Sequence, residues 1–292
     1  MSAVFRREIL SYFTSPIGYI FLAAFYGFSA FSFTSNSLKF GTTKMDGMFQ
    51  QLMIILIVLI PILTMRTMSE EKKNKTDQCL LTAPVGLGGI VAGKFLAAFL
   101  IYIMGIAVTL VYAVVISAFA APDWSVIIGN FVGLALVGAA FIAVGIFCSS
   151  LTENQVVSAV ISFIAMIALY MLTTIGDVVP ADFIEKMLPD VGAVWRTVIT
   201  EAIVIALTAA IFFLFGKRSG VLIGGFIVML VLGLFAAKGE LVPKILGKLS
   251  FWERYVGFTY GLFDLSNALF FLSAAVVFLF LTVRVLEKRR WA

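Results

Sequence analysis

The pattern most suggestive of chemistry is Gly-x-x-x-x-Gly-Lys over residues 88–94, which resembles the front of a phosphate-binding loop. A working loop continues with Ser or Thr, whose hydroxyl binds Mg²⁺, and it follows a strand of a soluble α/β domain. Here Phe95 follows Lys94, and the segment leads straight into a long apolar run. The sequence therefore predicts that residues 88–94 are not a nucleotide site.

Other chemistry-bearing residues are few. The chain has no His and only two Cys, Cys79 and Cys148, which lie in different segments. Zinc needs about four Cys or His ligands, so a metal site is not expected. Glu201 lies in the first turns of an expected membrane helix, where it either lines a polar pathway or, as we favour, sits near the membrane surface. We therefore predict no catalytic, cofactor-binding or metal-binding residues, and an intramembrane enzyme is disfavoured.

Composition defines the class of protein. Hydrophobic residues make up 62% of the 292 residues and charged residues 13%, with a mean hydropathy of +1.09. A soluble domain has roughly 25% charged residues. The charges cluster between apolar runs of about 17–25 residues, the length that crosses a bilayer as a helix. The sequence predicts an all-α polytopic membrane protein, and its net charge of +5 indicates flanks facing anionic lipid rather than nucleic acid.

The apolar runs predict about eight spanning helices in one transmembrane domain over residues 1–292. Two of them are short and are separated from each other by Gly216-Lys217-Arg218-Ser219-Gly220. Residues 198–237 therefore either span the membrane twice or form a hairpin that does not fully cross it. Residues 177–197 and 238–263 are expected outside, the second largely as an amphipathic helix. The eight expected spans are Ile17–Phe33, Phe49–Met65, Phe95–Ala118, Val126–Phe147, Val156–Ile175, Val198–Phe215, Val221–Ala237 and Leu265–Val285.

An even number of spans places both termini on one side. Basic residues then indicate which side, because cytoplasmic flanks carry more Lys and Arg. The densest clusters, including Arg6-Arg7, Lys72-Lys73, Lys217-Arg218 and Lys288-Arg289-Arg290, all share the side of the termini. We therefore expect both termini to be cytoplasmic.

Residues 1–15 are predicted to form an amphipathic helix lying in the membrane interface. Its apolar positions recur at helical spacing, with the charged residues expected on the other side. The residues that define this elbow helix are Arg6, Arg7, Tyr12, Phe13 and Pro16, with Phe5 and Ile9 completing the apolar face. Ser15 ends the helix, because Pro16 suits the first turn of the next one.

The cytoplasmic segment 66–94 has a charged opening, a short apolar patch and a proline break. One interpretation is a small helix that contacts a partner. The alternative is a solvated turn whose charges only set the topology. The residues concerned are Glu70, Glu71, Lys72, Lys73, Thr76, Leu80, Leu81, Pro84 and Val85.

This segment resembles the loop between the second and third helices of type-2 ABC exporter permeases, especially the gliding-motility and nitrous-oxide-reductase-maturation branches. The family pattern is Glu-Glu-basic-basic-x-Gly-Thr-x-Glu-Leu-Leu-Leu-Thr-x-Pro-Val, then Gly-Lys-Phe. It matches Glu70 to Lys73, Thr76, Leu80 to Thr82, Pro84, Val85 and Gly93 to Phe95. Lys75 stands where Gly is usual and Gln78 where Glu is usual. Tyr12-Phe13-x-Ser15-Pro16 and Gly261-x-x-Asp264 resemble the family's start and its last helix; the hairpin 198–237 is extra to the usual six spans.

The resemblance implies the membrane-spanning subunit of an ATP-driven exporter in a bacterial-type cytoplasmic membrane. ATP and Mg would bind a separate ABC ATPase subunit, which contacts the segment 66–94. A second permease chain, identical or paralogous, would complete the path, and an auxiliary extracytoplasmic subunit would contact the outer segments. Two alternatives stay open: an ion-coupled secondary transporter, which predicts buried carboxylates or broken helices, and a membrane scaffold without transport.

Overall fold

The computed structural model describes residues 2–76, 86–172, 247–261 and 263–290. The chain divides into two compact units, Met1–Ala168 with Arg254–Ala292, and Leu169–Glu253. Little of the second unit lies among the described residues. There the ring of Tyr170 packs edge-on against Trp252, with centroids 5.4 Å apart. The first unit contains nearly all of the described helical residues.

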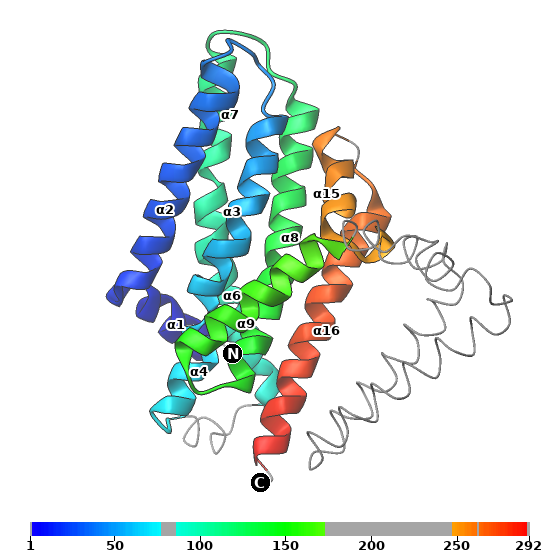
Figure 1. The fold of residues 1–292 in the computed structure, drawn as a ribbon. Helices are drawn as coiled ribbons and strands as arrows, with labels where there is room; N and C mark the ends of the chain where they lie inside the picture. Colours follow the sequence, from blue (N-terminus) through cyan, green and yellow to red (C-terminus); the bar gives the residue numbers. More distant parts are fainter. Residues whose placement is uncertain (1, 77–85, 173–246, 262, 291–292) are drawn as a thin grey trace, which may run out of the picture. The chain divides into compact units, whose positions relative to one another are not determined.

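Every regular element in the described part of the chain is a helix (Figure 1). Among the described residues, five helical runs are long and apolar enough to cross a membrane: Pro16–Leu38, Asp46–Lys73, Leu87–Ser117, Trp124–Leu151 and Leu265–Arg290. The predicted fold class, an all-α polytopic membrane protein, is confirmed. The elements are α1 Ser2–Thr14, α2 Pro16–Phe33, the π-helix η1 Thr34–Leu38, α3 Asp46–Thr64, α4 Arg66–Lys73, α6 Leu87–Ile106, α7 Val108–Ser117, α8 Trp124–Leu151, α9 Gln155–Tyr170, α15 Phe251–Thr259 and α16 Leu265–Arg290.

Two expected spans differ from the helices observed. The third begins at Leu87 rather than at Phe95, so that Lys94 lies inside α6. This is possible because partners from other helices neutralise the Lys94 charge, as described below. The fifth is represented by α9, which has 16 residues and ends at Tyr170. The spans expected at Val198–Phe215 and Val221–Ala237 lie outside the described residues.

The break between α1 and α2 follows the sequence prediction. Ser15 adopts an extended backbone conformation (φ −96°, ψ 155°) and Pro16 opens α2. Proline fits this first turn because its missing N–H would have no helical partner there. Gly18 then allows the two helices to cross closely, since a Cβ at this position would lie 2.6 Å from the carbonyl oxygen of Tyr12.

Helix α8 is the centre of the first unit and packs against α3, α6 and α16. Its glycines permit these close approaches. A Cβ on Gly138 would overlap the ring of Tyr102 from α6, whose hydroxyl donates to the Leu134 carbonyl at 2.6 Å. A Cβ on Gly145 would overlap the buried side chain of Thr64 from α3. Small residues at such positions let membrane helices pack backbone to side chain.

We expect Gly145→Ala to lower the free energy of unfolding by about 1–3 kcal/mol, the usual cost of overpacking a filled interior. Gly27→Ala is the matched control, because nothing lies within 4 Å of a Cβ at that helical position. Alanine is also the better helix former, so the control should be neutral or slightly stabilising. Thermal unfolding in detergent would measure both, and equal melting temperatures for the two variants would contradict the packing argument.

Near the other end of α8, the short helix α15 packs against two glycines that lie one turn apart. A Cβ on Gly133 would lie 2.8 Å from the Cβ of Phe258, and one on Gly129 would lie 3.1 Å from the Phe258 carbonyl oxygen. The Tyr255 hydroxyl lies 3.2 Å from Asn130 Oδ1, and both side chains are fully buried. Gly129 and Gly133 therefore serve helix packing, and within the described part of the segment expected to be amphipathic, α15 covers Phe251–Thr259.

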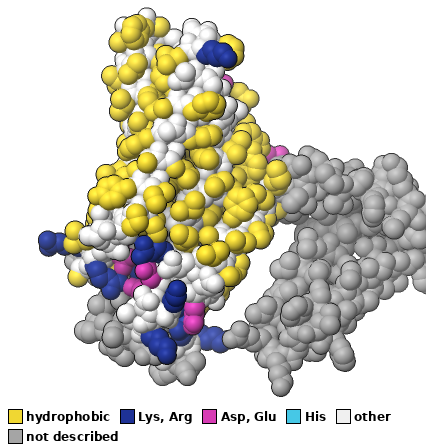
Figure 2. All heavy atoms as spheres, turned by 60° about the vertical axis from the view of Figure 1, so that its left-hand side comes forward, with side chains coloured by type: hydrophobic (Ala, Val, Ile, Leu, Met, Phe, Trp, Pro, Cys, Tyr) yellow, Lys and Arg dark blue, Asp and Glu magenta, His cyan; other side chains and the backbone are white. Residues whose placement is uncertain are grey.

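One end of the first unit carries most of its charged residues. We call it the base: it is formed by α1, α4, the first turns of α6, and the C-terminal ends of α8 and α16 (Figure 1). Figure 2 shows Lys, Arg, Asp and Glu side chains gathered there, below a mostly hydrophobic flank. The N-terminal helix α1 and the last turn of α16 therefore lie at the same end of the unit.

Candidate functional site

Four charged side chains from three helices form a closed ring at the base. Lys94 of α6 places its Nζ 3.0 Å from Oε1 of Glu8 and 3.0 Å from Oε1 of Glu71. Arg7 places its guanidinium 2.7 Å from the same Glu8 oxygen and 2.5 Å from the same Glu71 oxygen. Each carboxylate thus lies between two cations, and the ring as a whole is neutral. Helix α1 supplies Arg7 and Glu8, and α4 supplies Glu71.

The ring has an inner and an outer corner. The Lys94 side chain is 1% exposed and also donates to the Thr67 carbonyl at 2.8 Å, so it is fully desolvated and fully partnered. Arg7 is 52% exposed, while Glu8 and Glu71 are 12% and 16% exposed. A buried charge is tolerated only when it is paired and hydrogen-bonded. Lys94 therefore depends on this set of partners to remain where it is.

One sequence expectation, the side of α1 on which Glu8 lies, is corrected here. Glu8 does not lie with Arg6 and Arg7 on the exposed side of α1; it faces inward with the apolar residues, because Lys94 lies beneath it. Residues 88–94, the segment that resembled a phosphate-binding loop, are helical, and the lysine is held by two carboxylates and a carbonyl. This geometry supports the prediction that the segment is not a nucleotide site.

Helix α4 is also bound to the end of α8. The Ser149 hydroxyl accepts from the amides of Met68 and Ser69, both at 3.0 Å, and donates to the Met65 carbonyl at 3.1 Å. These groups lie at the bend where α3 gives way to α4, so Ser149 satisfies backbone atoms that the bend exposes. The buried ammonium of Lys72 donates to the Ser150 carbonyl. Together these contacts fix the direction in which α4 leaves the bundle.

Tyr12 joins α1 to the same bend. Its hydroxyl donates to the Leu63 carbonyl at 3.2 Å and lies 3.5 Å from Thr67 Oγ1. Burial raises the pKa of Tyr12 to about 12, so the phenol donates as a neutral hydroxyl. The predicted elbow helix is thus attached to α3 and α4 by Tyr12 and to α6 by Glu8.

The end of α4 explains one departure from the family pattern. Lys75 has φ +58°, its amide donates to the Lys72 carbonyl at 3.2 Å, and the Thr76 amide donates to the Glu71 carbonyl at 3.0 Å. This pair of bonds is the Schellman motif, whose left-handed residue is usually Gly. Lys75 thus occupies a left-handed position that favours Gly, which is the usual residue here in the loop pattern that the segment resembles.

Replacing Lys75 with Gly should therefore stabilise the end of α4. A left-handed conformation costs a residue with a Cβ about 1–2 kcal/mol, and Gly avoids this cost but loses more chain entropy on folding. We expect a net gain of up to about 1 kcal/mol. Hydrogen exchange of the amides of Asn74 to Thr76 would measure it. Faster exchange in Lys75→Gly than in the parent would contradict the assignment of the motif.

The other predicted contact residues take varied positions. Glu70 accepts two hydrogen bonds of 2.6 Å from Arg66, one turn earlier in α4. Lys73 and Thr76 are exposed, as is Arg6 on α1, and Phe13 is half-buried. Leu80, Leu81, Pro84 and Val85 lie outside the described residues. The structure thus brings Glu71 and Lys72 into the base and leaves the edge from Lys73 to Thr76 open.

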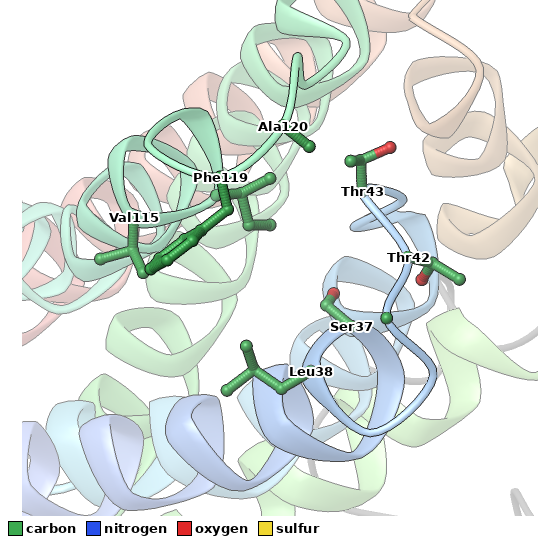
Figure 3. Close-up of a pocket in the computed structure, with 9 residues that line it drawn as sticks. Ser37, Leu38, Thr42, Thr43, Val115, Phe119 and Ala120 are labelled. Atoms are coloured by element: carbon green, nitrogen blue, oxygen red, sulfur yellow. The ribbon is translucent and has the colours of Figure 1, made fainter.

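A second feature, at the opposite end of the unit, is a pocket of about 180 Å³ between the turn after η1 and the end of α7 (Figure 3). Leu38, Val115 and Phe119 line its apolar side, and Ser37, Thr42 and Thr43 contribute hydroxyls. No ionisable side chain lines it. The pocket carries no acid, base or metal ligand, so the base remains the candidate functional site.

A bundle of apolar helices with a charged, tightly hydrogen-bonded base defines an integral membrane protein whose polar contacts concentrate at one membrane surface. Residues 6–169 match the family model described as ABC-2 family transporter protein. The match covers more than half of the chain, so the chain belongs to this family and is a permease of the ABC transporter class. No curated protein matches the chain. The matched region contains α4, α6 and most of α1, and therefore all four residues of the ring. Such permeases are membrane components and are not themselves the ATPase.

Proposed function

We propose that the chain is the membrane-spanning subunit of an ATP-driven exporter and that a separate ABC ATPase subunit binds at the base. ATP and Mg bind that subunit. Two permease chains, identical or paralogous, form the translocation path, and the base with both termini faces the cytoplasm of a bacterial-type cell. Within the family, the loop pattern supports the gliding-motility and nitrous-oxide-reductase-maturation branch. An auxiliary subunit on the outer side would contact residues 177–197 and 238–263.

The attachment of α4 supports this proposal most strongly. A segment that receives force from an ATPase must be joined firmly to the helices that move. Helix α4 is continuous with the span α3, is paired with α1 and α6 through Glu71, and is bonded to α8 through Ser149. Its other edge, from Lys73 to Thr76, is exposed and leads into the apolar stretch around Leu80. One side of the segment is fixed, and the other is open to a partner.

The positions of the charged residues weigh against the two alternatives, a secondary transporter and a passive scaffold. A secondary transporter needs ionisable groups near mid-bilayer, whereas the charged residues of the described spans lie within a few turns of a helix end. Lys94 is eight residues into its span, and Arg284 lies in the last two turns of α16. A passive scaffold needs no buried ion ring at the root of a cytoplasmic loop, since an exposed loop is stable without one.

Purification of the tagged chain in mild detergent tests the proposal. We expect an ABC ATPase subunit to co-purify in equimolar amount and the complex to hydrolyse ATP. The chain alone should neither bind nor hydrolyse ATP. Mass spectrometry of the complex would identify the subunits and give the stoichiometry. Recovery of the chain without any ATPase, from membranes that transport normally, would refute it.

A further inference from the structure

The ring at the base connects elements that are far apart in the sequence. Glu8 and Lys94 are 86 positions apart, and Arg7 and Glu71 are 64 apart. Of its members, only Arg7 and Glu8 are neighbours in the chain, so the ring is not a by-product of one helix surface. It joins α1, which precedes the first span, to α4, which follows the second, and to the start of the third span.

We propose that Lys94 is a positioning residue for energy coupling: it holds α1 and α4 together so that both move as one rigid part when the ATPase acts on α4. This inference rests on the proposed function. It adds that the elbow helix is driven directly through the ring, and that Glu71 and Lys94 serve this internal linkage rather than contact with the ATPase.

Burial of the inner corner makes the linkage stiff. If α4 moved away from α1, Lys94 would keep only one carboxylate in a site that water does not reach, and an unpaired buried charge is strongly unfavourable. The Tyr12 hydrogen bond to Leu63 opposes the same separation. Arg7 closes the ring from the solvent side and contributes less, since exposed ion pairs are weak. Separation of α1 from α4 is thus resisted chiefly at Lys94.

The ring is also unsuited to bind a partner. Its two cations and two anions satisfy one another, and the carboxylate oxygen of Glu71 already has two cationic partners. Charges at a docking surface remain available in the free subunit, whereas the four charges of the ring are already paired with one another inside the subunit. The exposed side chains of Lys73 and Lys75 are the basic groups of this segment that remain on its open edge.

Glu8→Gln and Glu71→Gln test the proposal in the complete transporter complex. Each removes one negative corner while keeping shape and hydrogen-bonding capacity. We expect both variants to retain the ATPase subunit on purification but to lose at least about fivefold in the ATP hydrolysis rate of the complex, the lower range of a coupling free energy. Lys94→Arg preserves the charge and should retain most of the activity.

Glu153→Gln is the matched control. Glu153 also forms an ion pair at the base, with Arg289 of α16 at 3.4 Å, but within the described residues it forms no ion pair or hydrogen bond with α1 or α4. Its hydrolysis rate should be unchanged. A merely structural role of the ring predicts that activity follows melting temperature, with full rates well below melting in every variant, and that result would overturn the proposal.

A distance measurement distinguishes a coupling role of the ring from a merely structural role. Spin labels replace the exposed side chains of Arg6 and Lys73 after Cys79 and Cys148 have been changed to Ser. In the parent complex, the distance between the labels should be the same without nucleotide and with trapped nucleotide; in Glu71→Gln it should shift or broaden. A nucleotide-dependent change already present in the parent would refute rigid movement. Absence of an ATPase subunit from the parent complex would instead refute the proposed function.

Discussion

Replacing Leu80 and Leu81 together with Asp is expected to give a chain that reaches the membrane at normal levels but is purified without its ATPase subunit. An apolar patch on a cytoplasmic loop usually marks an interaction surface. Burying two new carboxylates in that interface would cost several kcal/mol, because neither would have a partner. Loss of about 3 kcal/mol weakens binding more than a hundredfold. Insertion should survive, since the patch lies outside the predicted spans.

Glu70→Lys provides the graded comparison. Glu70 is partly exposed and pairs with Arg66 within α4, so its reversal should weaken binding mildly and mainly slow association. Quantitative pull-down of the ATPase subunit from equal amounts of each variant measures both effects. If the double Asp variant retains its ATPase partner and full hydrolysis, the segment is a topological turn, and the ATPase must bind elsewhere.

Lys94→Met is expected to cause the largest loss of folding stability among single changes at the base. Methionine fills a similar volume but leaves Glu8 and Glu71 close together, with only Arg7 to compensate both. Breaking a buried ion pair from one side typically costs about 3–5 kcal/mol. We expect a clear drop in melting temperature in detergent and a lower yield of folded protein.

Arg7→Met is the matched comparison, because it removes the other cation of the same ring at its exposed corner. Exposed pairs contribute about 0–1 kcal/mol, so this variant should melt close to the parent. The two variants change the net charge equally, which separates burial from charge. Equal losses of melting temperature in Lys94→Met and Arg7→Met would show that burial of Lys94 does not determine how much the ring contributes to stability.

Local signals in the sequence predicted much of this fold. Runs of apolar residues located the spans, and Ser15-Pro16 located the break between α1 and α2 because the physics of that break is contained in two residues. Asp264, which the family resemblance placed at the start of the last helix, directly precedes α16, and its carboxylate accepts from the Ser266 amide at 2.9 Å. The contact of Gly129 and Gly133 with α15 could not be inferred from the sequence spacing alone.

The site was predicted less completely, because its bonds connect distant parts of the chain. Lys94 gave little signal, because a lysine that precedes an apolar run is usual at a membrane surface and needs no counter-charge there. Glu8, 86 positions away, was expected on the exposed side of α1 with the other charged residues. Ser149 carried no signal, because a serine at a helix end is common and its function depends on the bend at Met65.

Contact between the edge of α4 and an ABC ATPase is the claim on which the account depends most directly. A photo-crosslinking amino acid placed at Thr76, which is exposed and follows the Schellman turn, should give a covalent adduct with the ATPase subunit in intact membranes. The same amino acid at Phe119, which is 87% exposed at the opposite end, should give none. Strong ATPase adducts at Thr76 alone are the predicted result; no ATPase adduct at Thr76, or equal adducts at both positions, would contradict the account.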